Sequence, residues 1–228
     1  MVIIVNPYIP LASAEDRDTY LSLVRDVAYE TQANEPECLA YCWTRPVSNS
    51  DASTDSTAFV LGLEVYKNPD ALAVKHRGSA PYLKMREVVT ATALITFPKG
   101  GVPLYKAAGS GFLLKKGAPE SVSPENFFVI IQYTARDWDH ASRFIDEEHK
   151  LSKEMKETEG VLALWCFVPE TSEDEVHITI FMRLSNESYY SNTVENRIRS
   201  FEAAAIDQEA IARTGWWTGQ GFGFFREK

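Results

Sequence analysis

One short phrase occurs twice in this chain, and it limits the folds that the sequence can adopt. Residues 109–116 read GSGFLLKK and residues 221–228 read GFGFFREK, so each phrase combines Gly-x-Gly-Phe with an apolar residue and a charged tail. A phrase that recurs about half a chain apart is typical of an internal repeat. We therefore interpret the 228 residues as two copies of one fold.

The match extends backwards from the phrase through three pairs of segments. The aligned segments are 59–68 with 177–186, 35–43 with 158–166, and 2–6 with 128–132. The numbering offset grows from 112 between Gly111 and Gly223 to 126 between residues 2 and 128, and each change falls in a connection such as 48–56. Length differences that are confined to connections are expected between two copies of one fold.

Both copies have the same expected order of elements, strand-helix-strand-strand-helix-strand. In the first copy we expect strands at 2–8, 38–46, 57–67 and 103–115, a helix capped by Ser13, and a helix over 69–95. In the second copy we expect strands at 127–134, 161–169, 175–185 and 216–227, and helices over 138–158 and 187–213. This β-α-β-β-α-β order is the ferredoxin-like unit of the α+β class. We expect domains at 1–116 and 126–228 with a linker at 117–125, which contains prolines and serines.

Charge and composition exclude several classes of partner. The net charge is -9 and the pI is about 5.0, which disfavours a nucleic-acid or anionic-membrane surface. The first ten residues lack a basic segment and read as a strand, and no run approaches the roughly 18 apolar residues of a membrane span. Cys38 and Cys42 would lie roughly 13 Å apart along one strand, too far for a disulfide. Free thiols favour a cytoplasmic location.

An ordered set of residues resembles the antibiotic-biosynthesis monooxygenase domain family. The set consists of Glu35-Pro36-Glu37-Cys38, Glu64-Val65-Tyr66, His76, and Ser79-Ala80-Pro81-Tyr82. The resemblance covers roughly 1–112, while the second copy keeps the strand pattern with fewer of these residues. It implies a dimeric α+β barrel, and two copies in one chain imply that the chain supplies both halves as an intramolecular pseudo-dimer. A further homodimer is left open.

The same resemblance implies a chemistry. Members of the family oxidise quinols, anthrones or related aromatic polyketides with O₂, often without a metal or flavin. The protein then has to deprotonate a small aromatic molecule, hold the anion in a dry pocket and admit oxygen. We therefore expect a cofactor-independent oxygenase whose partners are a small aromatic molecule and O₂.

Six residues stand where this family places functional groups. The expected catalytic residues are Asn6, Tyr66 and His76. The expected substrate-binding residues are Tyr82, Trp43 and Arg77. Structural alternatives exist for each type: a strand-end Asn that starts a turn, a core Tyr or Trp, and a surface His or Arg on a helix.

The second copy lacks most of these groups. Asn6 aligns with Gln132 and Tyr66 with Leu184, and no histidine falls near 192–194, where the counterpart of His76 is expected. This half reads as a degenerate, structural partner. The histidines and cysteines lack the spacing of a dedicated metal site, so no metal is expected.

Three other functions remain open at this point. A histidine base and an amide that holds an oxyanion serve an isomerase, cyclase or lyase of a polyketide intermediate as well as an oxygenase. Heme degradation would use His76 as the axial ligand, although the tryptophan usual in that branch is replaced by Tyr66. A small-molecule binding module without catalysis is the fourth reading.

Overall fold

The computed structural model describes residues 2–47, 58–95, 102–170, 176–205 and 211–227, with the side chains of 211–214 left aside. In these ranges the first half contains β1 (Ile3–Val5), β2 (Tyr8–Pro10), α1 (Ala14–Asn34), β3 (Cys38–Pro46), β4 (Phe59–Tyr66), the π-helical turn η2 (Ala71–His76), α2 (Ala80–Ala91) and β5 (Leu104–Phe112). The second half contains β6 (Phe127–Ala135), α3 (Trp138–Glu157), β7 (Val161–Pro169), β8 (Val176–Leu184), α4 (Glu187–Tyr189), the π-helical turn η3 (Tyr190–Val194), α5 (Glu195–Ala205) and β9 (Ile211–Phe225). The class is mixed α+β with one large antiparallel sheet.

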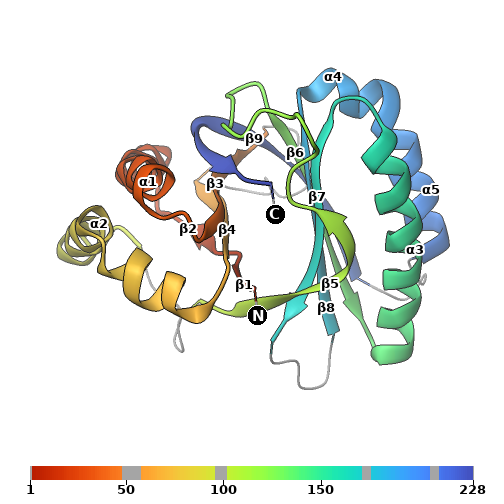
Figure 1. The fold of residues 1–228 in the computed structure, drawn as a ribbon, viewed down its shortest axis with the longest axis horizontal. Helices are drawn as coiled ribbons and strands as arrows, with labels where there is room; N and C mark the ends of the chain where they lie inside the picture. Colours follow the sequence, from red (N-terminus) through yellow and green to blue (C-terminus); the bar gives the residue numbers. More distant parts are fainter. Residues whose placement is uncertain (1, 48–57, 96–101, 171–175, 206–210, 228) are drawn as a thin grey trace.

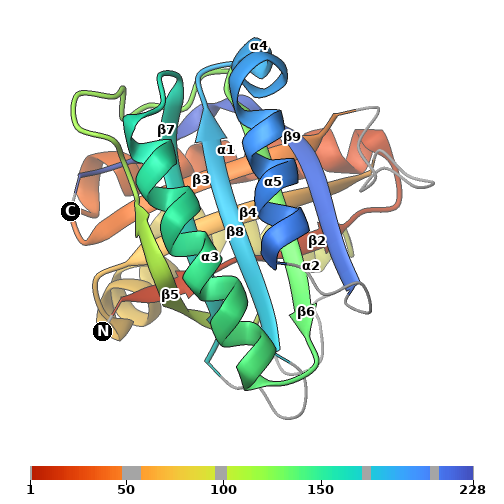
Figure 2. The ribbon, with the colours of Figure 1, turned by 90° about the vertical axis from the view of Figure 1, so that its right-hand side faces the viewer.

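The strands form one sheet that curves round on itself, so that the strands of the two halves face each other across a shared core, and helices cover the sheet on two sides. The sheet order is β1-β5-β7-β8-β6-β9-β3-β4-β2, and β1 also pairs with β4, so the succession of pairings returns to its start. Helices α1 and α2 lie on one side of the molecule and α3 and α5 on the other, with the strands between them (Figure 1). Figure 2 shows α3 and α5 lying across β8 and β6.

The two halves pair their strands in the same register. Tyr66 on β4 faces Ile3 on β1 and Cys38 on β3, and Leu184 on β8 faces Phe127 on β6 and Val161 on β7. The equivalent strands β3 and β7 also each carry an irregularity in register directly after this position, between Cys38 and Ala40 in β3 and between Val161 and Ala163 in β7. Positions in one half can therefore be compared with positions in the other through their hydrogen-bonded partners.

The repeated phrase lies where the last strand of each half joins the sheet of the other half. β5 pairs with β7, and β9 pairs with β3. Gly111 faces Trp165 with φ 155°, and Gly223 faces Cys42 with φ 101°. A Cβ at these glycines would lie 2.6 Å from the carbonyl oxygen of Leu164 and 2.5 Å from that of Tyr41, respectively. Only glycine fits both this backbone conformation and this close approach.

The charged tail of each phrase caps a helix of the other half. The guanidinium of Arg226 donates to the carbonyls of Gln32 (2.5 Å), Glu35 (2.7 Å) and Cys38 (2.7 Å), at and just beyond the end of α1. The Nζ of Lys115 donates to the carbonyl of Thr158, directly after α3, at 3.0 Å. These bonds satisfy carbonyls that a helix end leaves without partners.

Most of the predicted elements are confirmed, with three corrections. Ser13 is the N-cap of α1 and accepts a hydrogen bond from the amide of Asp16. The predicted strand 2–8 is two short strands that bend at 6–7, and the predicted helix 69–95 is η2 followed by α2, which begins anew beside Pro81. The predicted helix 187–213 ends at 205 because β9 begins at 211, where it pairs with β6. The predicted connection 48–56 lies outside the described residues.

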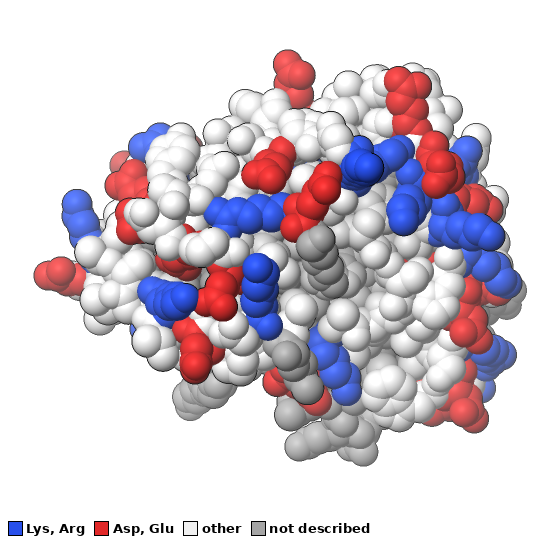
Figure 3. Space-filling view, in the orientation of Figure 1, with Lys and Arg blue, Asp and Glu red and all other residues white. Residues whose placement is uncertain are grey.

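The face of the molecule drawn in Figure 3 carries no patch of a single sign of charge among its described residues. Acidic and basic side chains are interspersed over this face (Figure 3). Among the described residues, no helix is long and apolar enough to cross a membrane.

Candidate functional site

A partly open cavity lies between the sheet of the first half and its helices. Its wall comes from β1, β3 and β4 on one side and from α1, η2 and α2 on the other. Its volume is about 70 Å³, which corresponds to about two water molecules at the roughly 30 Å³ that each occupies in the liquid. The lining residues that matter below are Tyr20, Tyr41, Trp43, Glu64, His76, Arg77 and Tyr82.

His76 is the last residue of η2, and its side chain is completely buried. The interpretation of His76 as a surface helix residue is therefore wrong. Its ring lies 5.3 Å from the rings of Tyr41 and Tyr66 and 5.1 Å from that of Tyr82, measured between centroids. A π-helical turn changes the direction of the following side chains relative to an α-helix and is frequent at functional sites.

One nitrogen of His76 is held by a buried carboxylate. Nδ1 lies 3.1 Å from Oε2 of Glu35, and the hydroxyl of Thr31 donates to Oε1 of the same carboxylate at 3.2 Å. An ionised carboxylate only accepts hydrogen bonds, so Nδ1 carries a proton, and in the neutral form of the ring Nε2 is the acceptor. In the described structure Nε2 is buried and has no hydrogen-bond partner. The arrangement suits a general base that faces the cavity.

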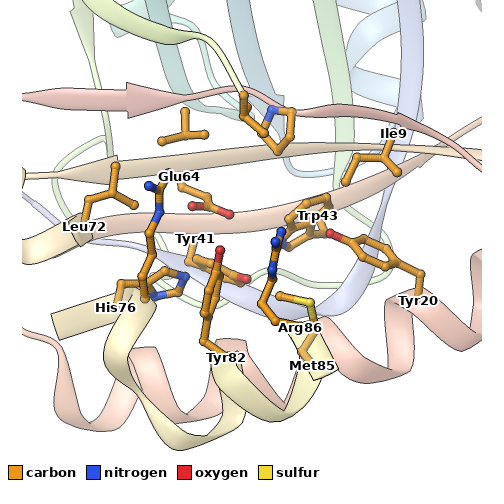
Figure 4. Close-up of a pocket in the computed structure, with 14 residues that line it drawn as sticks. Ile9, Tyr20, Tyr41, Trp43, Glu64, Leu72, His76, Tyr82, Met85 and Arg86 are labelled. Atoms are coloured by element: carbon orange, nitrogen blue, oxygen red, sulfur yellow. The ribbon is translucent and has the colours of Figure 1, made fainter. Parts of the chain in front are cut away.

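A second carboxyl group, Glu64, lines the same cavity and was missed by sequence reasoning. It lies on β4, and its Oε2 accepts a hydrogen bond of 2.9 Å from the hydroxyl of Tyr66. Burial raises the pKa of Glu64, although the charge of His76 in its protonated form, the bond from Tyr66 and the charge of Arg77 oppose the shift. The signal was present in the sequence, because a carboxylate inside the apolar strand FVLGLEVY requires a partner or a role. Figure 4 shows Glu64 entering the pocket from the strands, with His76 and Tyr82 on the helix side.

Three tyrosines surround these groups and remain neutral. Burial raises the pKa of Tyr20, Tyr41 and Tyr82, and the charge of Glu64 adds to the shift in each case. Neutral phenols can donate hydrogen bonds to an anion in the cavity. Trp43 packs edge-on against Tyr20, with ring centroids 5.3 Å apart.

The structure brings together four of the six predicted site residues. His76, Tyr82, Trp43 and Arg77 line the cavity, and Arg77 does so from an exposed position. Tyr66 is fully buried and lies beside His76, outside the set of lining residues. Asn6 is also outside that set: its amide donates to the carbonyl of Gly62 at 2.6 Å, which joins the bend after β1 to β4.

The second half has apolar residues at the corresponding positions. By strand register and by position in the π-helical turn, Glu64 corresponds to Met182, Tyr66 to Leu184 and His76 to Val194. All three second-half residues are completely buried. The scaffold therefore folds without polar groups at these positions, so their presence in the first half is not required by the fold.

The register also corrects one alignment made from the sequence. Val5 faces Glu64 and Val129 faces Met182, so Asn6 corresponds to Ile130 and not to Gln132. Gln132 is exposed on β6. In the second half, Phe144 stacks on Tyr133 with centroids 4.4 Å apart and contacts Phe201, so aromatic rings fill the space under α3 and α5.

The described residues show no metal site. Within those ranges, no group of three or more His, Cys, Asp or Glu side chains is placed to hold an ion. The cavity of about 70 Å³ is also far smaller than a porphyrin, so the residues present do not fit a heme beside His76.

Comparisons with known proteins give a likeness of structure only. No protein-family model matches the sequence, and no curated protein matches it. A "putative monooxygenase" from Fusobacterium nucleatum subsp. nucleatum is similar with a TM-score of 0.67 and 10% identity, over 100% of this chain and 98% of that chain. The chain shares its fold. A second protein of that description, from Lactobacillus acidophilus, gives a TM-score of 0.65 and 12% identity over 97% of each chain. An "anthrone oxidase-like protein" gives a TM-score of 0.54 and 10% identity over 95% of this chain and 91% of that chain.

Proposed function

We propose that this protein is a cofactor-independent monooxygenase that acts on a small phenolic aromatic substrate in the first-half cavity. The observation that carries the proposal is His76, whose Nδ1 is held by Glu35 while its buried Nε2 has no partner among the described residues at the wall of an aromatic-lined cavity. The structural neighbours described as monooxygenase and anthrone oxidase-like are consistent with this chemistry.

In this mechanism the substrate supplies the electrons and the protein supplies a base. Nε2 of His76 removes a proton from the phenol, and Glu35 stabilises the imidazolium that forms. The hydroxyls of Tyr41 and Tyr82 and the charge of Arg77 stabilise the resulting anion. The electron-rich anion then reacts with O₂ inside a cavity from which bulk water is excluded.

The size of the cavity narrows the substrate class. A volume of about 70 Å³ is less than half of the roughly 150 Å³ that holds benzene in an engineered apolar cavity. A single-ring ligand therefore requires half-buried side chains of the wall, such as Tyr82, to move, and the three fused rings of an anthrone or a larger polyketide require far more. A one-ring quinol is electron-rich, flat and acidic enough to serve as its own reductant. We therefore take a single-ring quinol as the substrate class of first choice.

We also propose that the chain is a tandem pair of monooxygenase-type domains, 1–116 and 126–228, joined by 117–125. The shared register, the matching irregularities of β3 and β7, and the reciprocal exchange of β5 and β9 support this proposal. The second domain then acts as the partner that closes an intramolecular barrel, with Arg226 bonding the carbonyl of Glu35, the residue that orients His76.

An oxygen electrode tests the proposal. Purified protein in chelator-treated buffer is given hydroquinone, methylated hydroquinones and anthrone, and wild type is compared with His76→Val, which copies the residue of the second half. His149→Ala, at an exposed position on α3, is the matched control. We expect oxygen uptake with a one-ring quinol that is lost in His76→Val and retained in the control. Uptake at the buffer rate with every substrate contradicts the proposal, and product formed without oxygen favours an isomerase.

A further inference from the structure

We propose that Glu64 is a second catalytic residue that accepts a proton, and that the substrate is a para-dihydroxy aromatic ring held by one hydroxyl at His76 and the other at Glu64. This inference rests on the proposed function and deepens it. It names both the group that completes the acid–base chemistry and the substitution pattern of the ring.

The geometry of Glu64 leaves one carboxylate oxygen for a ligand. The bond from Tyr66 goes to Oε2, and in the described structure neither another hydrogen bond nor an ion pair involves this carboxyl. Glu64 lines the same cavity as His76 and lies close enough to it for their charges to interact. Oε1 is therefore the atom that a hydroxyl in the cavity would meet.

The second half shows that the fold does not need this carboxyl. Met182 occupies the corresponding position: it faces Val129 on β6 as Glu64 faces Val5 on β1, and it is completely buried. Burying a carboxylate is costly even with the charges of His76 and Arg77 nearby, whereas burying methionine in the same place is not. A costly group at a cavity wall that an apolar residue could fill points to chemistry at that wall.

The reaction releases two hydroxyl protons from the substrate. A para-quinol and O₂ give a hydroxyquinone and water: the two O–H bonds and one ring C–H bond break, one C–O bond forms and the O–O bond breaks. The quinol supplies all four electrons, the C–H proton ends on the new hydroxyl, and the two hydroxyl protons leave in the water. One imidazole holds only one proton at a time, so a second acceptor lets both hydroxyls lose their protons before the reduced oxygen takes them up as water. Burial makes Glu64 a stronger base than an ordinary carboxylate and fits it to this role.

A binding cycle under strict anaerobiosis tests the role of Glu64 without turnover. Hydroquinone and 4-methoxyphenol, in which one hydroxyl is blocked, are titrated calorimetrically into wild type, Glu64→Gln and Glu64→Met. Glu64→Gln keeps an acceptor for Tyr66, and Glu64→Met copies the second half. Glu148→Gln, which changes a buried carboxyl on α3 far from the cavity wall, is the control. Thermal unfolding checks that each variant is folded.

We expect wild type and Glu148→Gln to bind hydroquinone about tenfold more tightly than 4-methoxyphenol, corresponding to about 1.4 kcal/mol. Both Glu64 variants should bind the two ligands within about twofold of each other. A preference that survives in both Glu64 variants, or no preference in wild type, overturns the role of Glu64. If the preference depends on Glu64 but wild type consumes no oxygen, the monooxygenase proposal fails and the inference about Glu64 stands. If wild type consumes oxygen but shows no preference for hydroquinone, the inference about Glu64 fails and the monooxygenase proposal stands.

Discussion

The buried carboxyl of Glu148 in the second half makes the stability of the protein depend on pH in a calculable way. Glu148 lies on α3, is completely buried, and its Oε2 accepts a hydrogen bond of 2.9 Å from the amide of Ser110 on β5. Burial raises the pKa of Glu148 from 4.5 to about 7, although the bonds from Ser110 oppose the shift. The native state therefore holds a proton that the unfolded chain releases between these two pH values.

The sign and the size of the effect follow from proton linkage. Because the native state binds more protons than the unfolded state between pH 4.5 and 7, the free energy of unfolding falls as the pH rises through this window. A pKa raised from 4.5 to about 7 corresponds to a loss of at most about 3 kcal/mol above pH 7, at 1.36 kcal/mol per pKa unit. For a chain of this size that is about 6–12 °C in Tm.

Urea unfolding of wild type and Glu148→Gln at pH 5 and pH 8 measures this loss. We expect the stability of the variant relative to wild type to increase by about 2–3 kcal/mol between the two pH values, since the amide does not titrate. Glu147→Gln, at a half-exposed neighbouring position, should show no such change. Parallel pH profiles for wild type and Glu148→Gln would refute the argument, because Glu148 would then titrate alike in both states.

Three further changes have outcomes that the structure specifies. Gly223→Ala should destabilise the protein by at least about 1–2 kcal/mol in urea unfolding, because φ is 101° and the added Cβ meets the carbonyl oxygen of Tyr41. Gly78→Ala, whose Cβ would have no described atom within 4 Å, is the control and should not destabilise the protein, so equal losses in the two variants would contradict the argument. Arg183→Met should cost about 3–5 kcal/mol, because it leaves the carbonyls of Pro119 and Ser121 and the side chain of Asn126 without their buried donor, at about 1–3 kcal/mol for each unsatisfied group. A loss below about 1 kcal/mol would show that these acceptors find other partners. Glu35→Gln should lower kcat for the quinol by about 10²–10⁴-fold with little change in the anaerobic Kd of the quinol. An amide that donates to Nδ1 of His76 favours the tautomer in which Nε2 carries the proton and is no longer a base. An unchanged kcat would remove Glu35 from the mechanism.

Local signals in the sequence predicted the fold because the two halves repeat them. The Gly-x-Gly-Phe phrase marks the two places where a backbone approaches another too closely for a Cβ, and only glycine meets that need. The alignment of Asn6 with Gln132 failed by two residues for a physical reason. A shift of two along a strand keeps every side chain on the same face, so the apolar pattern alone does not fix the register.

The candidate site was predicted less completely, because its contacts join distant segments. Glu35 and His76 are separated by 41 residues, and their contact depends on how η2 packs against the end of α1. Glu64 could have been predicted, since it is two residues from Tyr66 on the same strand face and interrupts an apolar run. Asn6 was assigned a role because it stands where the resembling family places a functional group, whereas the structure bonds its buried amide to the carbonyl of Gly62.

The position of the four histidines offers the most direct test of the central claim, that substrate binds in the first half beside His76. His140, His149 and His177 all belong to the second half. In a protein with ¹³C-labelled histidine, kept free of oxygen, the account predicts that hydroquinone shifts the imidazole signal of His76 saturably and leaves the other three unchanged. Saturation that moves only second-half histidines, or no shift of His76 at concentrations that saturate binding, would contradict it.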